Sequence, residues 1–70
     1  DEFLCPITCE IMQDPVLTSD GHTYERLAIE EWFARGKKTS PLTNELLPNL
    51  NLIPVFALKG VIQKFKEKNG

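Results

Sequence analysis

The supply of cysteine and histidine is what most limits the folds open to this chain. A chain of 70 residues buries only a modest share of its surface, and such small domains are often stabilised by a metal ion or by disulfides. A structural zinc ion takes about four Cys or His ligands, whereas the chain has only Cys5, Cys9 and His22. A Cys5–Cys9 disulfide would close too short a loop to add much stability. We therefore predict a fold without metal or cofactor, held by hydrogen bonds, charge pairs and apolar packing.

Length and charge exclude several functional classes. The chain is long enough for one domain and too short for a large catalytic fold such as a barrel or dinucleotide-binding enzyme. Eight Lys and Arg against ten Asp and Glu is too even a balance for a nucleic-acid-binding module. No apolar run is long enough to span a membrane, and no secretory leader is expected in this segment. The two thiols favour a reducing compartment, the cytoplasm or the nucleus.

Turn signals and periodicity predict a single α+β domain without internal repeats. Residues 16–18 and 22–24 are expected to form a β-hairpin around the Asp20-Gly21 turn. A further short strand at 46–47 would complete a three-strand sheet. Residues 3–13 and 37–44 are predicted to be ordered loops, because each contains proline and lacks a regular apolar period.

Two helices are expected. The central one would be capped by Thr23 and end at Gly36, with the apolar residues Ala28, Ile29, Trp32 and Phe33 on one face. The second would begin near Pro54 and continue through Leu58, Val61, Ile62 and Phe65.

The residue types argue for binding rather than for chemistry on this chain. Cys9 and His22 could supply a nucleophile and its base, but nothing in the sequence places them together. The glutamates of the central helix fit a solvated face. By contrast, proline stiffens both loops beside an apolar residue, at Pro6-Ile7 and at Pro41-Leu42. Together with Trp32 these loops could frame a shallow groove for a partner protein, unless Ile7 and Leu42 are ordinary core residues.

Several spaced motifs together resemble one family. They are Phe3-Leu-Cys-Pro-Ile-Thr8, Ile11-Met-Gln-Asp-Pro-Val16, Gly21-His-Thr-Tyr-Glu-Arg26, Ile29-Glu-Glu-Trp32, Ser40-Pro-Leu-Thr-Asn44 and Leu58-Lys-Gly-Val-Ile62. In this order they are similar to the U-box domain of ubiquitin ligases, with a match from about residue 3 to residue 65. The chain 1–70 is accordingly interpreted as one U-box domain and as part of a larger protein.

The resemblance implies a compact RING-like fold without zinc, in which hydrogen bonds and charge pairs hold the two loops. The residues expected in that network are Glu10, Asp14, Asp20, Arg26, Ser40, Thr43 and Asn44. Losing one partner of such a half-buried network is costly.

The resemblance also implies a function. A U-box recruits a conjugating enzyme that carries ubiquitin as a thioester, and it promotes transfer to a substrate lysine without a covalent intermediate on the ligase. The residues that match its conjugating-enzyme contacts are Ile7, Cys9, Trp32, Pro41, Leu42 and Asn44. Cys9 is smaller than the usual residue there. Asn44 stands where many members carry an arginine that clamps ubiquitin, so we expect weaker or differently tuned stimulation.

Other readings and partners stay open at this point. The chain could be an inert interaction module with the same fold, or a degenerate zinc-binding RING whose melting temperature would fall when a chelator is added. Substrates would bind through regions outside this chain, and a homodimer is possible. A bacterial protein delivered to the cytosol of a host cell also fits the sequence.

Overall fold

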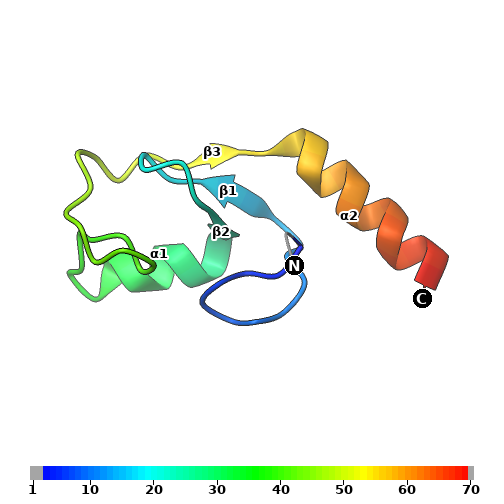
Figure 1. The fold of residues 1–70 in the computed structure, drawn as a ribbon, viewed down its shortest axis with the longest axis horizontal. Coiled ribbons are helices and arrows are strands. Elements are labelled where there is room, and N and C mark those ends of the chain that lie inside the picture. The colour runs from blue at the N-terminus through cyan, green and yellow to red at the C-terminus, as the bar shows by residue number, and fades with distance from the viewer. Residues whose placement is uncertain (1–2, 70) are drawn as a thin grey trace.

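The fold is built from five short elements, seen in a computed structural model that describes residues 3–69. They are β1 (Pro15–Leu17), β2 (Thr23–Glu25), α1 (Arg26–Ala34), β3 (Ile53–Pro54) and α2 (Phe56–Asn69). Figure 1 shows the small sheet in the middle, with α1 and α2 at opposite ends of a molecule 38 Å long and 19 Å by 18 Å across. The predicted α+β class, with two loops, a three-strand sheet and two helices, is confirmed.

The sheet is antiparallel, and its strand order is β2-β1-β3. The predicted hairpin forms, with Val16 opposite Tyr24. Each strand lies one residue further from the turn than predicted, at 15–17 and 23–25 instead of 16–18 and 22–24. Its turn closes through the Thr18 amide, which donates to the His22 carbonyl at 3.0 Å. Gly21 has a φ of +87°, a conformation that suits glycine because it has no Cβ.

The third strand lies elsewhere in the sequence than predicted. Leu46 makes only an isolated bridge with Thr39, so no strand forms at 46–47. Residues 53–54 pair with β1 instead, with Pro54 opposite Val16. Proline is tolerated there because β3 is an edge strand, whose outer side needs no donor.

Both helices begin later than predicted. Thr23 belongs to β2 and does not cap α1; Glu25 precedes the first helical residue and makes no side-chain capping bond. The helix ends as expected, because Gly36 takes a φ of +83° just after the C-cap. Pro54 lies in β3, and α2 starts at Phe56. Phe65 of α2 packs on Phe3, with ring centroids 5.3 Å apart, and so ties the first loop to the second helix.

The core lies where the sheet meets α1, α2 and the first loop. Its buried apolar members are Cys5, Met12, Val16, Tyr24, Ile29 and Ile62. All are at most 1% exposed. Because residues of the first loop, of β1 and β2 and of both helices share this cluster, these elements pack around one core.

The two loops repeat the same backbone pattern, which the sequence analysis did not predict. Segments 5–10 and 40–45 read Cys-Pro-Ile-Thr-Cys-Glu and Ser-Pro-Leu-Thr-Asn-Glu. In each, the first amide donates to the carbonyl of the glutamate, from Cys5 to Glu10 at 2.9 Å and from Ser40 to Glu45 at 2.8 Å. The prediction that the chain has no internal repeat is therefore wrong at this scale.

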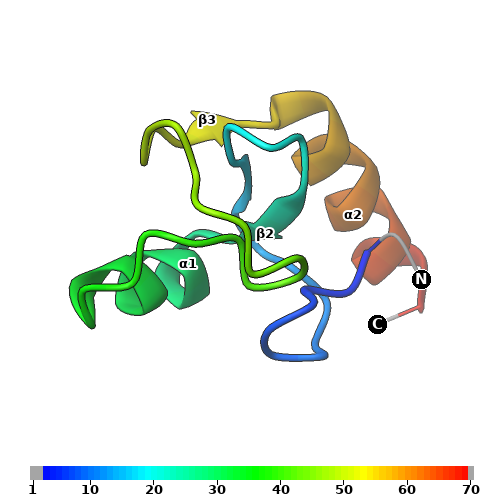
Figure 2. The same ribbon diagram turned by 60° about the vertical axis from the view of Figure 1, so that its left-hand side comes forward.

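The repeat extends to side chains and to backbone dihedral angles. The threonine of each loop accepts a bond from the glutamate amide two residues later, at 3.2 Å in both cases. The fifth position has a positive φ in each loop, +60° at Cys9 and +64° at Asn44. We call these six-residue turns the first and second knuckles; Figure 2 shows the loops that contain them.

Candidate functional site

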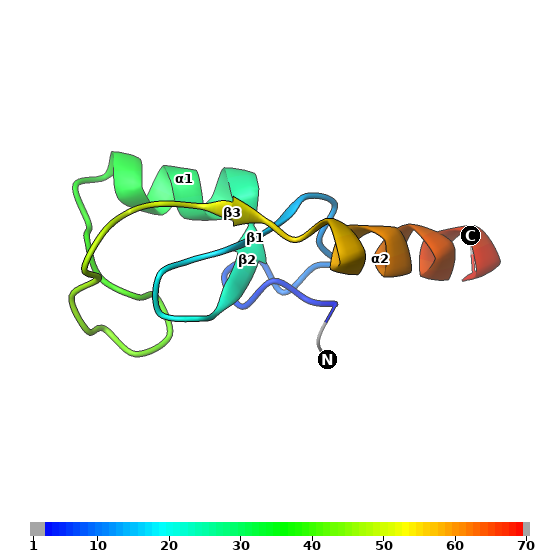
Figure 3. The same ribbon diagram turned by 90° about the horizontal axis from the view of Figure 1, so that it is seen from above.

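A groove of about 360 Å³ runs between the first knuckle and α1. Its walls come from residues 7–13 on one side and from α1 on the other, and its lining residues are Ile7, Thr8, Glu10, Ile11, Gln13, Glu25, Leu27, Ala28, Glu31, Trp32 and Arg35. Figure 3 shows from above how the first loop lies between the start of α1 and α2. Its openness to solvent and its mixed apolar and charged walls suit a protein surface better than an enclosed metabolite.

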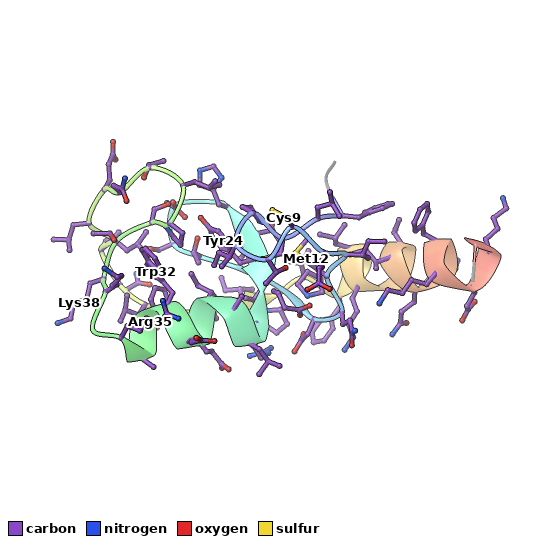
Figure 4. All side chains as sticks on the ribbon, turned by 90° about the horizontal axis from the view of Figure 1, so that it is seen from below. Cys9, Met12, Tyr24, Trp32, Arg35 and Lys38 are labelled. Atoms are coloured by element: carbon purple, nitrogen blue, oxygen red, sulfur yellow. The ribbon has the colours of Figure 1, made fainter. Side chains whose placement is uncertain are left out.

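Trp32 connects this groove to the second loop. Its indole Nε1 donates to the Thr39 carbonyl at 2.8 Å, directly before the second knuckle. The ammonium of Lys37 lies 5.2 Å from the ring centroid, within cation–π range. Figure 4 shows Trp32 and Arg35 close together at the C-terminal end of α1. The tryptophan therefore lines the groove and positions the second loop at the same time.

The first loop is fixed by carboxylates. Glu25 accepts the amides of Gln13 and Asp14, both at 2.8 Å. Asp14 in turn accepts from Arg26 Nε at 2.6 Å, and the Arg26 amide donates to the Asp14 carbonyl at 3.0 Å. Hydrogen bonds to a charged acceptor are among the stronger ones in proteins. Cys5 adds a weak bond, since its sulfur accepts the Glu25 amide at 3.3 Å.

The second knuckle is fixed by a buried group of hydroxyls. Ser40 is 1% exposed, and its oxygen lies 3.4 Å from the Tyr24 hydroxyl. Ser40 also bonds to Asp20, which accepts from the Thr18 hydroxyl as well. Burial raises the pKa of Tyr24 above its ordinary value of 10.0, and the neutral phenol can act as donor. Hydrogen bonds thus do at this position what a metal ion would do in a zinc domain.

Asp20 makes this network sensitive to acid. Burial raises the pKa of Asp20, but hydrogen bonds from Ser40 and Thr18 outweigh that effect and hold the pKa below its ordinary value of 3.8. The stabilisation from ionised Asp20 is thus complete above pH 3.8, the ordinary pKa that the group has in the unfolded chain. It is lost as the pH falls through the lower pKa of Asp20 in the folded domain. We predict that the stability advantage of the wild type over Asp20→Asn at about pH 7 shrinks steadily below about pH 4, measured by urea unfolding. An advantage that stayed constant down to about pH 2 would contradict this role for Asp20.

The structure brings only some of the expected contact residues together. Ile7 and Trp32 both line the groove. Cys9 is exposed on the first knuckle, outside the lining. The other three residues lie on the second knuckle: Pro41 is half-buried, Leu42 is 50% exposed and Asn44 is exposed. Trp32, through Thr39, is what links the two groups.

The residues expected to form one structural network fall into two separate groups, one at each loop, and Glu10 belongs to neither. Asp14 pairs with Arg26, while Asp20 bonds to Ser40. The Thr43 amide donates to the Ser40 oxygen at 3.4 Å. Glu10 behaves differently, because its carboxylate makes no hydrogen bond or ion pair within residues 3–69. It faces the groove instead.

Sequence reasoning missed two residues of the site. Glu25 was assigned to a solvated helix face, whereas it anchors the first loop. Its position at the end of the hairpin strand, opposite Pro15, is a signal that could have shown this. Leu27 lines the groove and is 76% exposed. Leu27 lies outside the apolar stripe of α1. A leucine on a polar helix face is a sequence signal that could have identified it as a contact residue.

The described part of the chain holds two free thiols and no cluster of metal-binding side chains. Residues 3–69 contain no group of three His, Cys, Asp or Glu side chains that could hold a metal ion. Cys5 is buried and Cys9 is exposed, and both thiols are free. Neither α1 nor α2, the helices described, is long and apolar enough to cross a membrane.

Comparison with known proteins gives consistent matches along the chain. The U-box domain family model matches residues 1–70. The human WD repeat, SAM and U-box domain-containing protein 1 is 51% identical over 67 residues, covering 96% of this chain and 14% of that protein. Rice U-box domain-containing protein 12 is 50% identical over 70 residues, covering 100% of this chain and 12% of the relative. U-box domain-containing protein 36 of Arabidopsis thaliana is 51% identical over 63 residues, or 90% of this chain and 14% of the relative. The chain thus spans a small part of the length of these relatives.

Proposed function

Because the chain belongs to the U-box family, whose members are generally ubiquitin ligase modules, we propose that its groove binds a ubiquitin-charged conjugating enzyme. The bound enzyme would then transfer ubiquitin to a substrate lysine. The observation that carries the proposal is the groove between the first knuckle and α1, joined to the second knuckle through Trp32. The two knuckles offer rigid apolar tips, Ile7 and Leu42, which are 37% and 50% exposed.

The proposed mechanism uses orientation rather than a reactive group on this chain. The substrate amine attacks the thioester carbonyl, an amide bond forms, the carbon–sulfur bond breaks, and the conjugating enzyme's cysteine leaves as a thiol. The domain favours this step by narrowing the poses of the flexible thioester-linked ubiquitin to one that admits the amine.

Asn44 is the proposed clamp on ubiquitin. It is exposed, and its side-chain amide makes no hydrogen bond within the described residues. We predict that Asn44→Arg raises the rate of ubiquitin discharge onto free lysine roughly two- to fivefold, because the guanidinium adds charge, reach and several donors. Single-turnover discharge of a preformed conjugate measures the rate.

The matched control is Asn44→Gly, which keeps the positive φ of +64° and removes the amide. It should lower the rate below wild type. If Asn44→Arg and Asn44→Gly discharged ubiquitin at equal rates, the clamp role would be wrong.

A second candidate is an inert interaction module with the same fold. The uncharged Asn44 and the small Cys9 favour it. We also propose protein substrates bound outside this chain and a location in a reducing compartment, the cytosol, the nucleus or a host cytosol, which the two free thiols support. A homodimer is a further proposal, supported by Ile53 and Phe56, which are 59% and 73% exposed at β3 and at the start of α2.

A panel assay separates ligase from inert module. The domain is mixed with ubiquitin, activating enzyme, ATP and each member of a set of conjugating enzymes, and ubiquitin chains or self-modification are read on gels. We expect activity with at least one enzyme. Binding to an enzyme without any stimulated transfer would favour the inert module.

A further inference from the structure

Leu27 is an apolar side chain held out on the wall of the groove. It is the second residue of α1 and is 76% exposed. Glu31 and Arg35 follow at intervals of four residues, so the three side chains lie on one helical face, and all three line the groove. A leucine at this place adds nothing to the core, since Ile29 and Ile62 fill that role. Its apolar area is available to a partner.

One carboxylate of the groove, that of Glu10, has neither a hydrogen bond nor an ion pair within residues 3–69. Glu31 pairs with Arg35, with Oε1 and Nη2 2.7 Å apart. Glu25 has one oxygen on the Gln13 amide and the other on the Asp14 amide. Glu10, on the opposite wall from α1, has no hydrogen bond or ion pair within residues 3–69. The groove therefore presents one carboxylate without a bonding partner in the described residues, Glu10, and one exposed aliphatic side chain, Leu27, from two different elements.

We propose that Leu27 and Glu10 together select among conjugating enzymes, favouring those that present an aliphatic side chain next to a lysine or arginine. The inference rests on the proposed function. Covering Leu27 removes apolar surface from water, while a basic partner side chain compensates Glu10. An enzyme with an acidic side chain at that place would face like-charge repulsion, which is an effective way to exclude a wrong partner.

The two residues affect binding differently. A contact at Leu27 acts mainly on the dissociation rate and depends little on salt. Glu10 is exposed, so its effect is on association and weakens as salt screens the charge. Salt dependence therefore separates the two contributions in a single series of measurements.

The experiment measures dissociation constants of a panel of purified conjugating enzymes for the wild type and for four variants, at about 50 mM and about 300 mM NaCl. The test variants are Leu27→Ser and Glu10→Gln. Leu46→Ser is the matched control for the leucine, because Leu46 is 73% exposed and lies outside the groove. Glu67→Gln is the control for the charge, since Glu67 is exposed on α2 at the other end of the molecule.

We expect Leu27→Ser to weaken the best-binding enzymes about tenfold at both salt concentrations and the poor binders hardly at all. Glu10→Gln should weaken the same enzymes about two- to fivefold at low salt only, and should improve binding of enzymes that are acidic at this place. Both controls should bind like the wild type. In the two test variants, the dissociation constants of the enzymes in the panel would therefore differ less from one another than in the wild type.

The outcomes distinguish this inference from the proposed function. If no enzyme of the panel bound the wild type, the proposed function itself would fail. If the wild type bound but Leu27→Ser and Leu46→Ser gave the same affinities, the selection by Leu27 would be wrong while ligase function stood. Equal losses across the whole panel would also contradict selection, since they would make Leu27 a general contact.

Discussion

Glu25→Ala is expected to lower the free energy of unfolding by about 2–4 kcal/mol, because the Gln13 and Asp14 amides lose a charged acceptor. Both bonds are 2.8 Å long, and the Asp14 amide is only part-exposed. For a domain of this size the loss corresponds to a drop in melting temperature of roughly 10–20 °C. Thermal and urea unfolding, followed by circular dichroism, measure both quantities.

The control is Glu30→Ala, which removes an exposed glutamate from α1, outside the groove. We expect it to change stability by about 0.5 kcal/mol at most. If Glu25→Ala and Glu30→Ala had the same melting temperature, the Glu25 carboxylate would not be what fixes the first loop. Glu25→Gln should fall between them, because it keeps one acceptor oxygen and loses the charge.

Ile7→Ala is expected to reduce ubiquitin transfer about 10- to 30-fold while the melting temperature stays nearly constant. The side chain lies on the groove wall and is 37% exposed, so its truncation removes docking surface rather than core. Discharge of the charged conjugating enzyme, measured at subsaturating domain concentration, reports the loss. Pro41→Ala should act in the same direction through the second knuckle.

The matched control is Leu50→Ala, which shortens a leucine that is 38% exposed in the segment before β3, outside the groove. It should keep wild-type transfer. Unfolding of the Ile7→Ala variant would instead show that Ile7 is a core residue, and equal transfer by both variants would remove Ile7 from the site.

Local features of the fold could be predicted from the sequence because neighbouring residues determine them. The Asp20-Gly21 turn and the end of α1 at Gly36 both depend on a glycine with positive φ. The strand at 53–54 depends on pairing with Val16, far away in the sequence. Two residues carry too little pattern to indicate such a pairing, and the sequence pattern favours the leucine pair at 46–47 instead.

The same limit applies to the site. Ile7 and Trp32 could be assigned to a groove from residue type and from family resemblance. The anchoring role of Glu25 could not be predicted in this way, because it depends on how the hairpin folds back over residues 13–14. The knuckle repeat shares only the proline, the threonine and the glutamate of its six positions. Such a short match gains meaning only when the hydrogen bonds show that the two turns have the same backbone.

The most direct test of the account is an NMR titration of the ¹⁵N-labelled domain with conjugating enzymes. If the groove and the two knuckles form one docking surface, at least one enzyme should shift the amide signals of Ile7, Leu27 and Trp32, together with signals of residues 40–45. The far end of α2 should stay unperturbed. Saturable shifts confined to α2 and β3, or no shifts with any enzyme, would contradict the central claim that this surface recruits the ubiquitin carrier.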